Sequence, residues 1–377
     1  MKIYLDNGAT TKVVPEVVRA MKPYFLNKYG NASSIHGFGR EAKKALDDSR
    51  KKIAKKLNAH FEEIVFTSGG SESNNLAIKG IVHTSEGNHI ITSKIEHPSV
   101  LETCKELEKQ DFKVDYLDVD KDGFVNLEQL KELINKKTIL VSIIHGNNEI
   151  GVIQDIKKIG DICKENNVLF HTDAVQSFTK FPINVKNMNI DLLSVSSHKI
   201  HGPKGVGALF VRKNVKLKKL IEGGHHEFNL RAGTENIHGV VGFARACELI
   251  KDSDIKSMER LRNYLIKELL KIKNTRLNGS LEKRLCNNVN ISFEFVEGES
   301  LLLHLDNKGI AVSTGSACTS QSLESSHVLM AIGLPHEIAH GSIRFTLSKF
   351  TKKEELDYTI ANVKKIVKNL RMISPLK

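Results

Sequence analysis

The sequence predicts an α/β protein with a mostly parallel, seven-stranded sheet covered by helices, followed by a smaller α+β unit. Short apolar runs alternate with amphipathic helical stretches from about residue 40 to residue 250, and such alternation is typical of parallel sheets with helices on their faces. After a long amphipathic stretch that begins near residue 252, this rhythm changes. The length of 377 residues also exceeds that of a usual single domain.

The strand candidates are short, apolar and rich in β-branched residues. In chain order they are EIVFT (63–67), HIITS (89–93), KVDYLDV (113–119), TILVSII (138–144), VLFHTDA (168–174), DLLSVSS (191–197) and GALFV (207–211). Helix candidates with apolar residues at helical spacing lie between most of them, at 99–109, 127–134 and 156–165.

The second unit begins with an amphipathic helix over 252–272. Strand-like segments such as NNVNISFEF and SIRFTL follow it, and a closing helix is predicted over 353–370. We predict a large domain at residues 14–253 and a small domain made of residues 1–13 and 254–377.

Composition is ordinary for a soluble globular protein, with 40% hydrophobic and 27% charged residues. The N-terminus has no long apolar core of a signal peptide, and no run of about eighteen uncharged apolar residues occurs, so no membrane span is predicted. The 5 cysteines are widely spaced and form no CxxC pair. This usage fits reduced thiols, and we expect a cytoplasmic protein.

The net charge of +12 raises the alternative of nucleic-acid binding. Lysines and arginines cluster in RKKIAKK (50–56) and RKNVKLKK (212–219), but no aromatic residues are interleaved with them. We interpret both stretches as solvated faces and expect no direct contact with nucleic acid.

Ligands in open α/β sheets gather at the carboxyl ends of the strands, so the residues just past each predicted strand are candidates for a binding site. After 63–67 comes SGGSESNNLAIKG (68–80), a Gly/Ser turn that opens a helix. Its backbone N–H groups and the Ser71 hydroxyl suit a phosphate group. A serine-capped helix is the alternative interpretation.

Lys199 follows the strand candidate 191–197, between His198 and the glycine-rich HGPKGVG. A lysine inside the fold at a strand end is suited to form a Schiff base, because burial lowers the pKa of its amine. Taken alone, Lys199 also fits a surface loop.

Two further strand ends carry Asp173, in FHTDAVQS, and His97, in KIEHPSVL. An inward carboxylate needs a cationic partner such as a protonated pyridine nitrogen, and Gln176 could donate to a phenolic oxygen. His97 could stack on a planar ring and shuttle protons. Read singly, Asp173 could be a helix N-cap and His97 a structural histidine.

Together, a phosphate cup, a Schiff-base lysine, a carboxylate for a pyridinium and a ring-stacking imidazole are the requirements of pyridoxal 5′-phosphate. The sequence therefore predicts this cofactor.

At these residues the sequence resembles the cysteine desulfurases, within the class V aminotransferase-like group of fold-type I pyridoxal-phosphate enzymes. The motifs follow the family's order from end to end: YLDNGATT, NASSIHGFGREA, FTSGGSESNN, EHPSVLET, NNEIGVIQDI, FHTDAVQS, SSHKIHGPKGVGAL, RAGTEN, STGSACTS and SIRFTL. The segment STGSACTSQSLESSHVL looks like the long-loop group that serves iron–sulfur cluster assembly or nitrogen fixation.

The resemblance implies that Lys199 holds the cofactor covalently, Asp173 binds the pyridine nitrogen, Gln176 binds the ring hydroxyl and His97 stacks on the ring. The phosphate would be held by Gly70, Ser71, Ser196 and His198, with Thr234 reaching across from the partner subunit of a homodimer. Asn148 and Arg344 would receive the substrate carboxylate, Arg344 as a bidentate fork and Asn148 also beside the cofactor.

The same resemblance implies the reaction. Lys199 takes the Cα proton of L-cysteine, the Cys318 thiolate attacks the substrate sulfur, and L-alanine leaves. Cys318 then holds a persulfide for acceptors such as an iron–sulfur scaffold protein. The polar stretch 319–326 predicts mobility. Iron–sulfur assembly, tRNA thiolation and nitrogenase maturation remain open as destinations.

Three other activities remain as alternatives: a selenocysteine lyase, an aminotransferase of the same fold, which would not need Cys318, and a silent binding scaffold. No metal site is predicted, because the adjacent His225 and His226 suit a loop contact better than one ion. Cys104, Cys163 and Cys247 read as core residues, and Cys286 is undecided.

Overall fold

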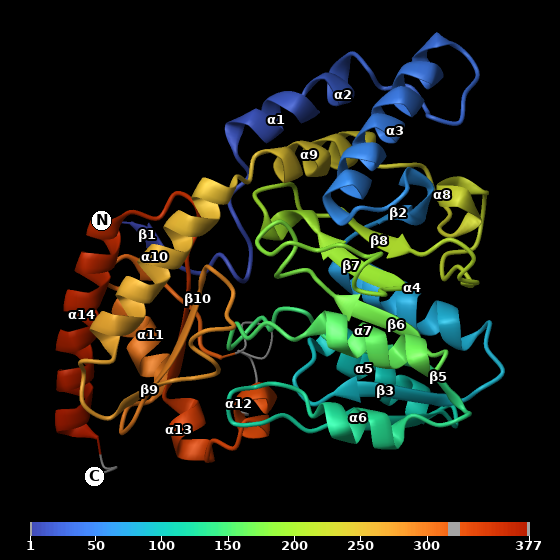
Figure 1. Cartoon of the computed structure of the whole chain (residues 1–377). Coiled ribbons are helices and arrows are strands. Elements are labelled where there is room, and N and C mark those ends of the chain that lie inside the picture. Colours follow the sequence, from blue (N-terminus) through green and yellow to red (C-terminus); the bar gives the residue numbers. More distant parts are fainter. Residues whose placement is uncertain (1, 316–324, 375–377) are drawn as a thin grey trace.

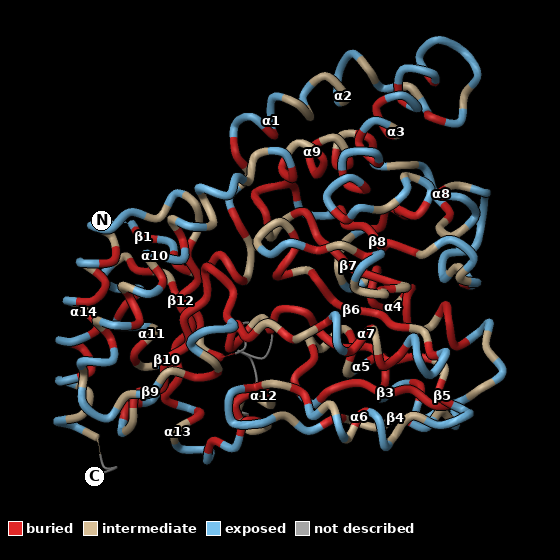
Figure 2. Tube along the Cα trace, viewed as in Figure 1, coloured by how far each residue is buried: buried red, intermediate tan, exposed pale blue. Residues whose placement is uncertain are grey.

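The computed structural model describes residues 2–315 and 325–374. Two lobes lie side by side in Figure 1, a larger one built around the long sheet and a smaller one that holds both ends of the described chain. The core of each lobe is a continuous set of buried strands and helix faces (Figure 2).

The large lobe contains a seven-stranded sheet. Its spatial order is β2 (Ile64–Thr67), β8 (Gly207–Val211), β7 (Leu192–Ser196), β6 (Leu169–Asp173), β5 (Thr138–Ser142), β3 (His89–Ser93) and β4 (Lys113–Leu117). Only β8 runs antiparallel to its neighbours in this sheet. The predicted α/β class with a mostly parallel sheet is confirmed. Several predicted runs extend past the observed strand ends because apolar residues such as Ile144 stay buried beyond the ladder.

Helices cover both faces of this sheet. Alternate residues of a strand point to opposite faces, so Ile64 and Phe66 pack into one core while Val65 packs into the other. The first face is covered by α1 (Pro15–Met21), α3 (Gly37–Leu57), α6 (Leu127–Leu133), α7 (Ile156–Glu165) and α9 (Ile237–Glu248). The second is covered by α4 (Gly70–Val82) and α5 (Pro98–Glu108). Short helical turns lie at α2 (Pro23–Leu26), α8 (His226–Asn229), η1 (Phe61–Glu63) and η2 (Ser197–Lys199).

The small lobe is built on an antiparallel sheet in which β10 (Asn288–Phe293) lies between β12 (Ser342–Thr346) and β9 (Thr275–Leu277). Its helices are α10 (Asp252–Leu269), α11 (Gly298–Asp306), α12 (His327–Ala331), α13 (His336–His340) and α14 (Lys353–Ile373). The N-terminal β1 (Ile3–Tyr4) pairs in parallel with β11 (Ile310–Ala311). Ile3 and Leu5 are thereby buried in the core of the small lobe.

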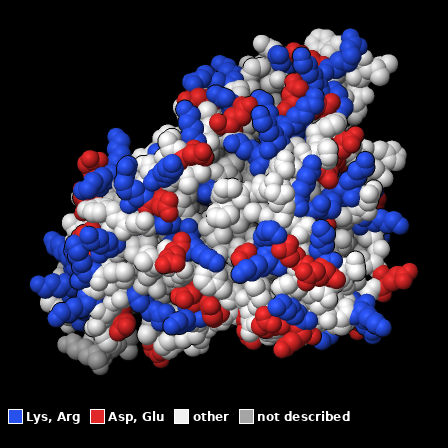
Figure 3. Space-filling model, viewed as in Figure 1, with Lys and Arg blue, Asp and Glu red and all other residues white. Residues whose placement is uncertain are grey.

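Charged side chains of both signs cover the face seen in Figure 3, with Lys and Arg spread over α3, α10 and α14 and Asp and Glu among them. Our interpretation of the stretch 50–56 as solvated is wrong at Arg50, which is 2% exposed. The Arg50 guanidinium donates to both carboxylate oxygens of Glu227, at 2.6 and 2.7 Å, and lies 4.7 and 4.9 Å from the ring centres of Phe66 and Phe228. Sequence spacing could not reveal this partner, because it lies on a distant turn.

The four cysteines within the described residues are buried and free of disulfides. Burial raises the pKa of Cys104 to about 12 and that of Cys286 to about 11, so both thiols stay protonated at neutral pH. Cys163 lies on α7 and Cys247 on α9, and both are buried in the core between these helices and the sheet. Within the described part of the chain, no helix is long and apolar enough to span a membrane.

Candidate active site

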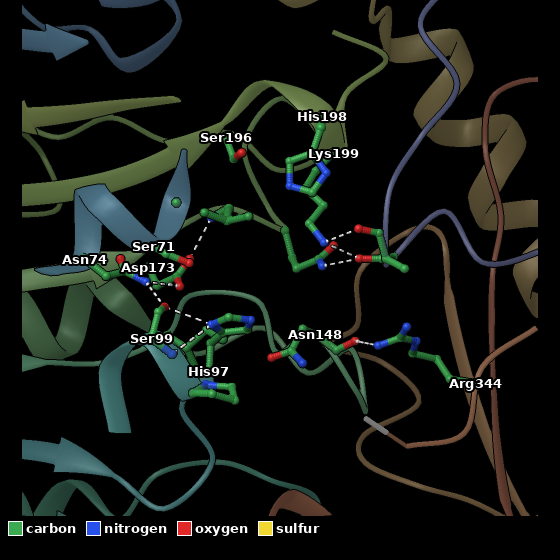
Figure 4. Close-up of a pocket in the computed structure, with 17 residues that line it drawn as sticks. Ser71, Asn74, His97, Ser99, Asn148, Asp173, Ser196, His198, Lys199 and Arg344 are labelled. Atoms are coloured by element: carbon green, nitrogen blue, oxygen red, sulfur yellow. Dashed lines mark hydrogen bonds between the residues drawn. The ribbon is translucent and has the colours of Figure 1, made fainter. Parts of the chain in front are cut away.

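A cavity of about 380 Å³ opens at the carboxyl ends of β3, β6 and β7, next to β12 of the small lobe (Figure 4). Its wall brings together nearly all residues that the sequence predicts for the site. They are Gly70, Ser71, His97, Asn148, Asp173, Gln176, Ser196, His198, Lys199 and Arg344. The wall also contains residues that the sequence reasoning missed, namely Gly8, Ala9, Asn74, Pro98, Ser99, Ile144 and Val175.

Asp173 ends β6 and is 4% exposed. Its Oδ2 accepts a hydrogen bond from the Asn74 side-chain amide at 2.7 Å, and its Oδ1 accepts one from the Val175 N–H at 2.9 Å. These donors fix the carboxylate so that it can meet a cationic group in the cavity. Asn74 lies within the segment SGGSESNN, in the second turn of α4, and no local signal distinguishes it from an ordinary polar residue of a helix.

Lys199 ends the short η2 turn that follows β7. Its Nζ donates to the backbone carbonyl oxygens of Gly8 and Ala9, at 2.6 and 2.8 Å. The N-terminal segment, which belongs to the small lobe at β1, therefore contacts the lysine of the large lobe. These two acceptors orient the amine at the wall of the cavity.

The other end of the cavity is formed by the start of α4. Within the described residues no side chain caps this helix, and Gly70 is its first residue. A Cβ at Gly70 would lie 2.7 Å from Val175 Cγ2, so the close approach of these two segments requires glycine. The open N–H groups, together with Ser71 and Ser196, form a cradle suited to a phosphate.

His198 lies beside this cradle, and its Nδ1 is 3.2 Å from the Thr10 hydroxyl. Burial lowers the pKa of His198 to about 4, and the charges of Lys199, Lys204 and Lys180 act in the same direction. The imidazole is therefore neutral at neutral pH and contacts an anion as a hydrogen-bonding group rather than as a cation.

His97 is both a cavity residue and a helix cap, so the two interpretations of this histidine coexist. Its Nδ1 accepts a hydrogen bond from the Ser99 N–H at 3.1 Å, which caps α5. Burial lowers the pKa of His97; Asp173 opposes this effect, and Lys199 and His327 add to it. A neutral imidazole at this position can accept a proton.

Arg344, on β12, reaches the cavity from the small lobe and is 2% exposed. Its Nη1 donates to the Asn148 carbonyl oxygen and its Nη2 to Asp6 Oδ1, both at 3.0 Å. Within the described residues, Arg344 Nε and Asn148 Oδ1 are buried without a hydrogen-bond partner. An orphaned donor at a cavity wall, here Arg344 Nε, is an anchor for a ligand that carries a carboxylate, whereas the orphaned acceptor Asn148 Oδ1 suits a ligand donor group.

Two predicted residues do not join this cavity within the described chain. Thr234 is exposed and is not part of the wall, and Cys318 lies outside the described residues. Most of the stretch 319–326 also lies outside them, although Ser326 is described and caps α12. His225 and His226 make loop contacts with Asn229 and with the Gly233 N–H.

The residues present fit pyridoxal 5′-phosphate. The cavity has a buried carboxylate fixed by Asn74, an amine at Lys199, and the start of α4, where Gly70 packs closely against Val175. These are groups of the kind that the ring nitrogen, the aldehyde and the phosphate of this cofactor require.

Comparisons with known proteins agree with this geometry. The family model Aminotransferase class-V matches residues 3–359. A cysteine desulfurase IscS of Dictyoglomus turgidum is 53% identical over 382 residues, which cover 100% of this chain and 97% of that protein.

Two solved structures are similar as well. One, described as a NifS-like protein, has a TM-score of 0.91 and 40% identity and covers 99% of this chain and 100% of its own. The other, described as SspA in complex with cysteine, has a TM-score of 0.84 and 38% identity and covers 93% of this chain and 100% of its own. The resemblance drawn from the sequence motifs is confirmed. The chain belongs to the class-V aminotransferase family and, within it, to the pyridoxal-phosphate-dependent cysteine desulfurases.

Proposed function

We propose that this chain removes sulfur from L-cysteine, giving L-alanine and a persulfide on Cys318. The observation that carries the proposal is the convergence of Lys199, Asp173 and Arg344 on one cavity. An amine, a fixed carboxylate and a guanidinium are the groups needed to activate and hold an amino acid in this chemistry. The similarity to curated cysteine desulfurases over the whole chain supports it further.

Pyridoxal 5′-phosphate, when bound, supplies an electron sink that makes the Cα–H bond of an amino acid acidic. Asp173 would hold the ring nitrogen, Gln176 the ring hydroxyl, and His97 would pack on the ring. The phosphate would be held by Gly70, Ser71, Ser196 and His198, with a contribution from Thr234 of the partner subunit.

The substrate carboxylate would bind to Arg344, whose orphaned Nε at the cavity wall supports this role, and to the side-chain amide N–H of Asn148, which lines the same cavity. Lys199 Nζ, oriented by the Gly8 and Ala9 carbonyl oxygens, would take the Cα proton. Positioning these groups before the reaction removes much of the entropic cost of bringing them together.

In the sulfur-transfer step the Cys318 thiolate attacks the sulfur of the substrate. An S–S bond forms and the substrate Cβ–S bond breaks, with its electron pair left on Cβ. Cβ then takes up a proton and becomes the methyl group of L-alanine. The sum is L-cysteine plus a thiol giving L-alanine plus a persulfide, so no external oxidant or reductant is required.

We also propose a homodimer and a persulfide transfer to acceptors such as an iron–sulfur scaffold protein. The homodimer is supported by the exposed Thr234 and by exposed apolar residues near α2 and the start of α3, among them Leu26, Tyr29 and Ile35. The acceptor is supported by the similarity to relatives named IscS. A cytoplasmic location is supported by the free cysteines of the described chain.

The separate hydrophobic cores of the two lobes support the domain division that we propose, residues 14–253 against residues 1–13 with 254–377. Among the described residues, the buried cluster around β10, β12 and α14 includes none from 14–253, and a smaller cluster joins Ile95 and Ile144 to Val328 and Leu329 where the two lobes meet.

The test uses the purified chain reconstituted with pyridoxal 5′-phosphate. It should be yellow, and with L-cysteine and a reductant it should release alanine and sulfide in equal amounts. Cys318→Ala should stay yellow and release neither, whereas the matched control Cys163→Ala, which changes a buried core thiol, should remain active. If Cys318→Ala released alanine and sulfide at the wild-type rate, the mechanism would be contradicted. A strong preference of the wild type for selenocysteine over cysteine would favour a selenocysteine lyase.

A further inference from the structure

The segment that carries Cys318 is flanked by Gly315 and Ser326, and one buried side chain binds Ser326 and lies beside Gly315. Glu149 is 1% exposed. Its Oε2 accepts a hydrogen bond from the Ser326 hydroxyl. A Cβ at Gly315 would lie 3.2 Å from that same oxygen and 3.0 Å from Ser326 Cβ. The two flanks therefore lie close together beside one carboxylate oxygen, and the absence of a side chain at Gly315 leaves room for this approach.

The backbone of Glu149 is held from both lobes. Its N–H donates to Asn147 Oδ1 at 2.9 Å, within the loop after β5. Its carbonyl oxygen accepts from the side-chain amides of Asn288 and Asn290 on β10, both at 3.1 Å. Buried hydrogen bonds of this kind rigidify the position of the residue that they fix.

The upstream flank is connected to the residue proposed to bind the substrate carboxylate. Ser313 and Arg344 exchange backbone hydrogen bonds of 2.7 and 3.2 Å, while the Arg344 guanidinium donates to the carbonyl oxygen of Asn148, the neighbour of Glu149. The chain that leads to Cys318 is thus aligned with Arg344.

The downstream flank is fixed in a similar way. The Ser326 hydroxyl that donates to Glu149 also accepts from the Leu329 N–H at 3.2 Å and so caps α12. His327 Nε2 lies 3.0 Å from the carbonyl oxygen of Glu96, the residue before His97. Both flanks therefore contact segments that supply the cavity wall.

We propose that Glu149 is a positioning residue for sulfur transfer, which fixes the two flanks of the Cys318 segment against the substrate-binding pair Asn148 and Arg344. The inference rests on the proposed function, because it concerns the step in which Cys318 attacks the substrate. Glu149 is not among the residues that line the cavity, so it acts through its neighbours Asn148 and Arg344.

The charge of Glu149 changes near neutral pH. Burial raises the pKa of Glu149 to about 7, and the Ser326 hydrogen bond and the charge of Arg344 oppose this rise. Within the described residues, the groups packed against its carboxylate and backbone from β10 and α12 are the neutral Asn288, Asn290 and Ser326. The charged group is Arg344 of β12, which also binds Asp6.

The carboxylate form, present above about pH 7, attracts Arg344 and accepts strongly from Ser326. Protonation weakens both interactions. The rate of sulfur transfer is therefore expected to rise through this pH range.

The experiment measures two quantities on holoenzyme from about pH 6 to about pH 9, the range in which such a group titrates. L-cysteine binding is followed by the absorption change of the bound cofactor, and Cys318 persulfide formed in a single turnover is quantified by mass spectrometry. Glu149→Gln should slow persulfide formation by about tenfold above pH 7, the loss expected for one charge-assisted hydrogen bond. The affinity for L-cysteine should stay within about twofold of the wild-type value. The inflection near pH 7 in the plot of the persulfide-formation rate against pH should disappear.

Ser326→Ala keeps the carboxylate but removes its hydrogen-bond donor. Because that hydrogen bond lowers the pKa of Glu149, the inflection should move to higher pH. Asn126→Ala is the matched control, since Asn126 caps α6 by accepting from two backbone N–H groups away from the cavity. It should leave both the rate and the inflection unchanged.

Wild-type rates and an unchanged inflection in Glu149→Gln would overturn the inference while leaving the proposed function intact, provided that Cys318→Ala forms no alanine. If Cys318→Ala releases alanine at the wild-type rate, the proposed function fails, and the role of Glu149 fails with it. If Glu149→Gln does not fold, the Ser326→Ala variant provides the test. An inflection that stays at the wild-type pH in the rate profile of Ser326→Ala would overturn the inference.

Discussion

The side-chain amide of Asn74 donates to Asp173 Oδ2 across 2.7 Å, and both residues are buried at the cavity wall. Asn74 also lies 2.8 Å from the Ser99 hydroxyl. The carboxylate proposed to bind the cofactor's ring nitrogen is therefore held in place by the helix whose first turn forms the phosphate cradle. Ring and phosphate contacts are coupled through α4.

Asn74→Ala should weaken the binding of pyridoxal 5′-phosphate by about tenfold, because loss of a hydrogen bond to a charged group costs roughly 1.5–3 kcal/mol. Titration of the apoenzyme with the cofactor, followed by absorption, measures this affinity. Asn88→Ala, which removes an exposed amide that donates to Asp111, is the control. Equal affinities for Asn74→Ala and the wild type would contradict the role assigned to this amide.

Gly70→Ala should weaken cofactor binding by about tenfold through overpacking, since such strain costs roughly 1–3 kcal/mol. The new methyl group would lie 2.7 Å from Val175 Cγ2. The double variant Gly70→Ala/Val175→Ala removes the clash and should recover most of the affinity. Gly37→Ala, where the nearest heavy atom lies 3.9 Å away, serves as a control. No recovery in the double variant would show that the clash is not the cause.

Arg344→Lys should raise the KM for L-cysteine by about one to two orders of magnitude, because an ammonium group cannot reproduce the geometry of the guanidinium fork. Within the described residues, Arg344 Nε is a buried donor without a hydrogen-bond partner, while Nη1 donates to the Asn148 carbonyl oxygen and Nη2 to Asp6. Steady-state kinetics gives KM and kcat separately. Arg276→Lys, on the partly exposed strand β9, should change neither value; an unchanged KM in Arg344→Lys would refute the substrate contact.

The stability of the protein should depend on pH through Glu96. Burial raises the pKa of Glu96 from 4.5 to about 8, although Ser93 and the Ile144 N–H donate to its Oε1. The folded state therefore keeps a proton that the unfolded state has lost between about pH 4.5 and pH 8, so the free energy of unfolding should fall as pH rises through this window.

Glu96→Gln removes that titration and should flatten the pH dependence, with a stabilisation on the order of a few kcal/mol relative to the wild type at the alkaline end. Urea unfolding at several pH values measures the difference. The exposed Glu106→Gln is the control, because its carboxylate pairs with Lys109 at the surface. Parallel stability curves for Glu96→Gln and the wild type would exclude the raised pKa.

Local rules were sufficient for the sheet and for part of the cavity wall, namely Ser71, His97, Asp173, Gln176 and Lys199. The wall residues Gly70, Asn148, Ser196, His198 and Arg344 followed instead from the resemblance to the cysteine desulfurases. Short β-branched runs predict strands, and polar residues just past them, such as Asp173 and Lys199, collect at one edge of a parallel sheet. Asn74 escaped because an amide in the second turn of a helix reads as an ordinary polar residue until Asp173 is seen opposite it.

Interactions between distant segments account for the rest. Glu149 stands beside Asn148 in the motif NNEIG, but its burial and charge depend on Gly315, Ser326 and Arg344, which no short pattern connects to it. Arg50 looked like one member of a basic surface stretch for the same reason. A buried partner on another turn of the chain changes the role of a charged residue, and only the fold reveals the partner.

The pairing of the first strand with the last third of the chain also orders events during synthesis. All strands of the long sheet lie between residues 64 and 211 and are available to fold once that region has left the ribosome. Ile3 must wait for Ile310, and the Asn7 side chain for the carbonyl oxygen of Thr346. The nascent N-terminus therefore remains without its partner strand until translation is nearly complete, and Gly8 and Ala9, which accept from Lys199, lie on a segment that lacks this anchor until then.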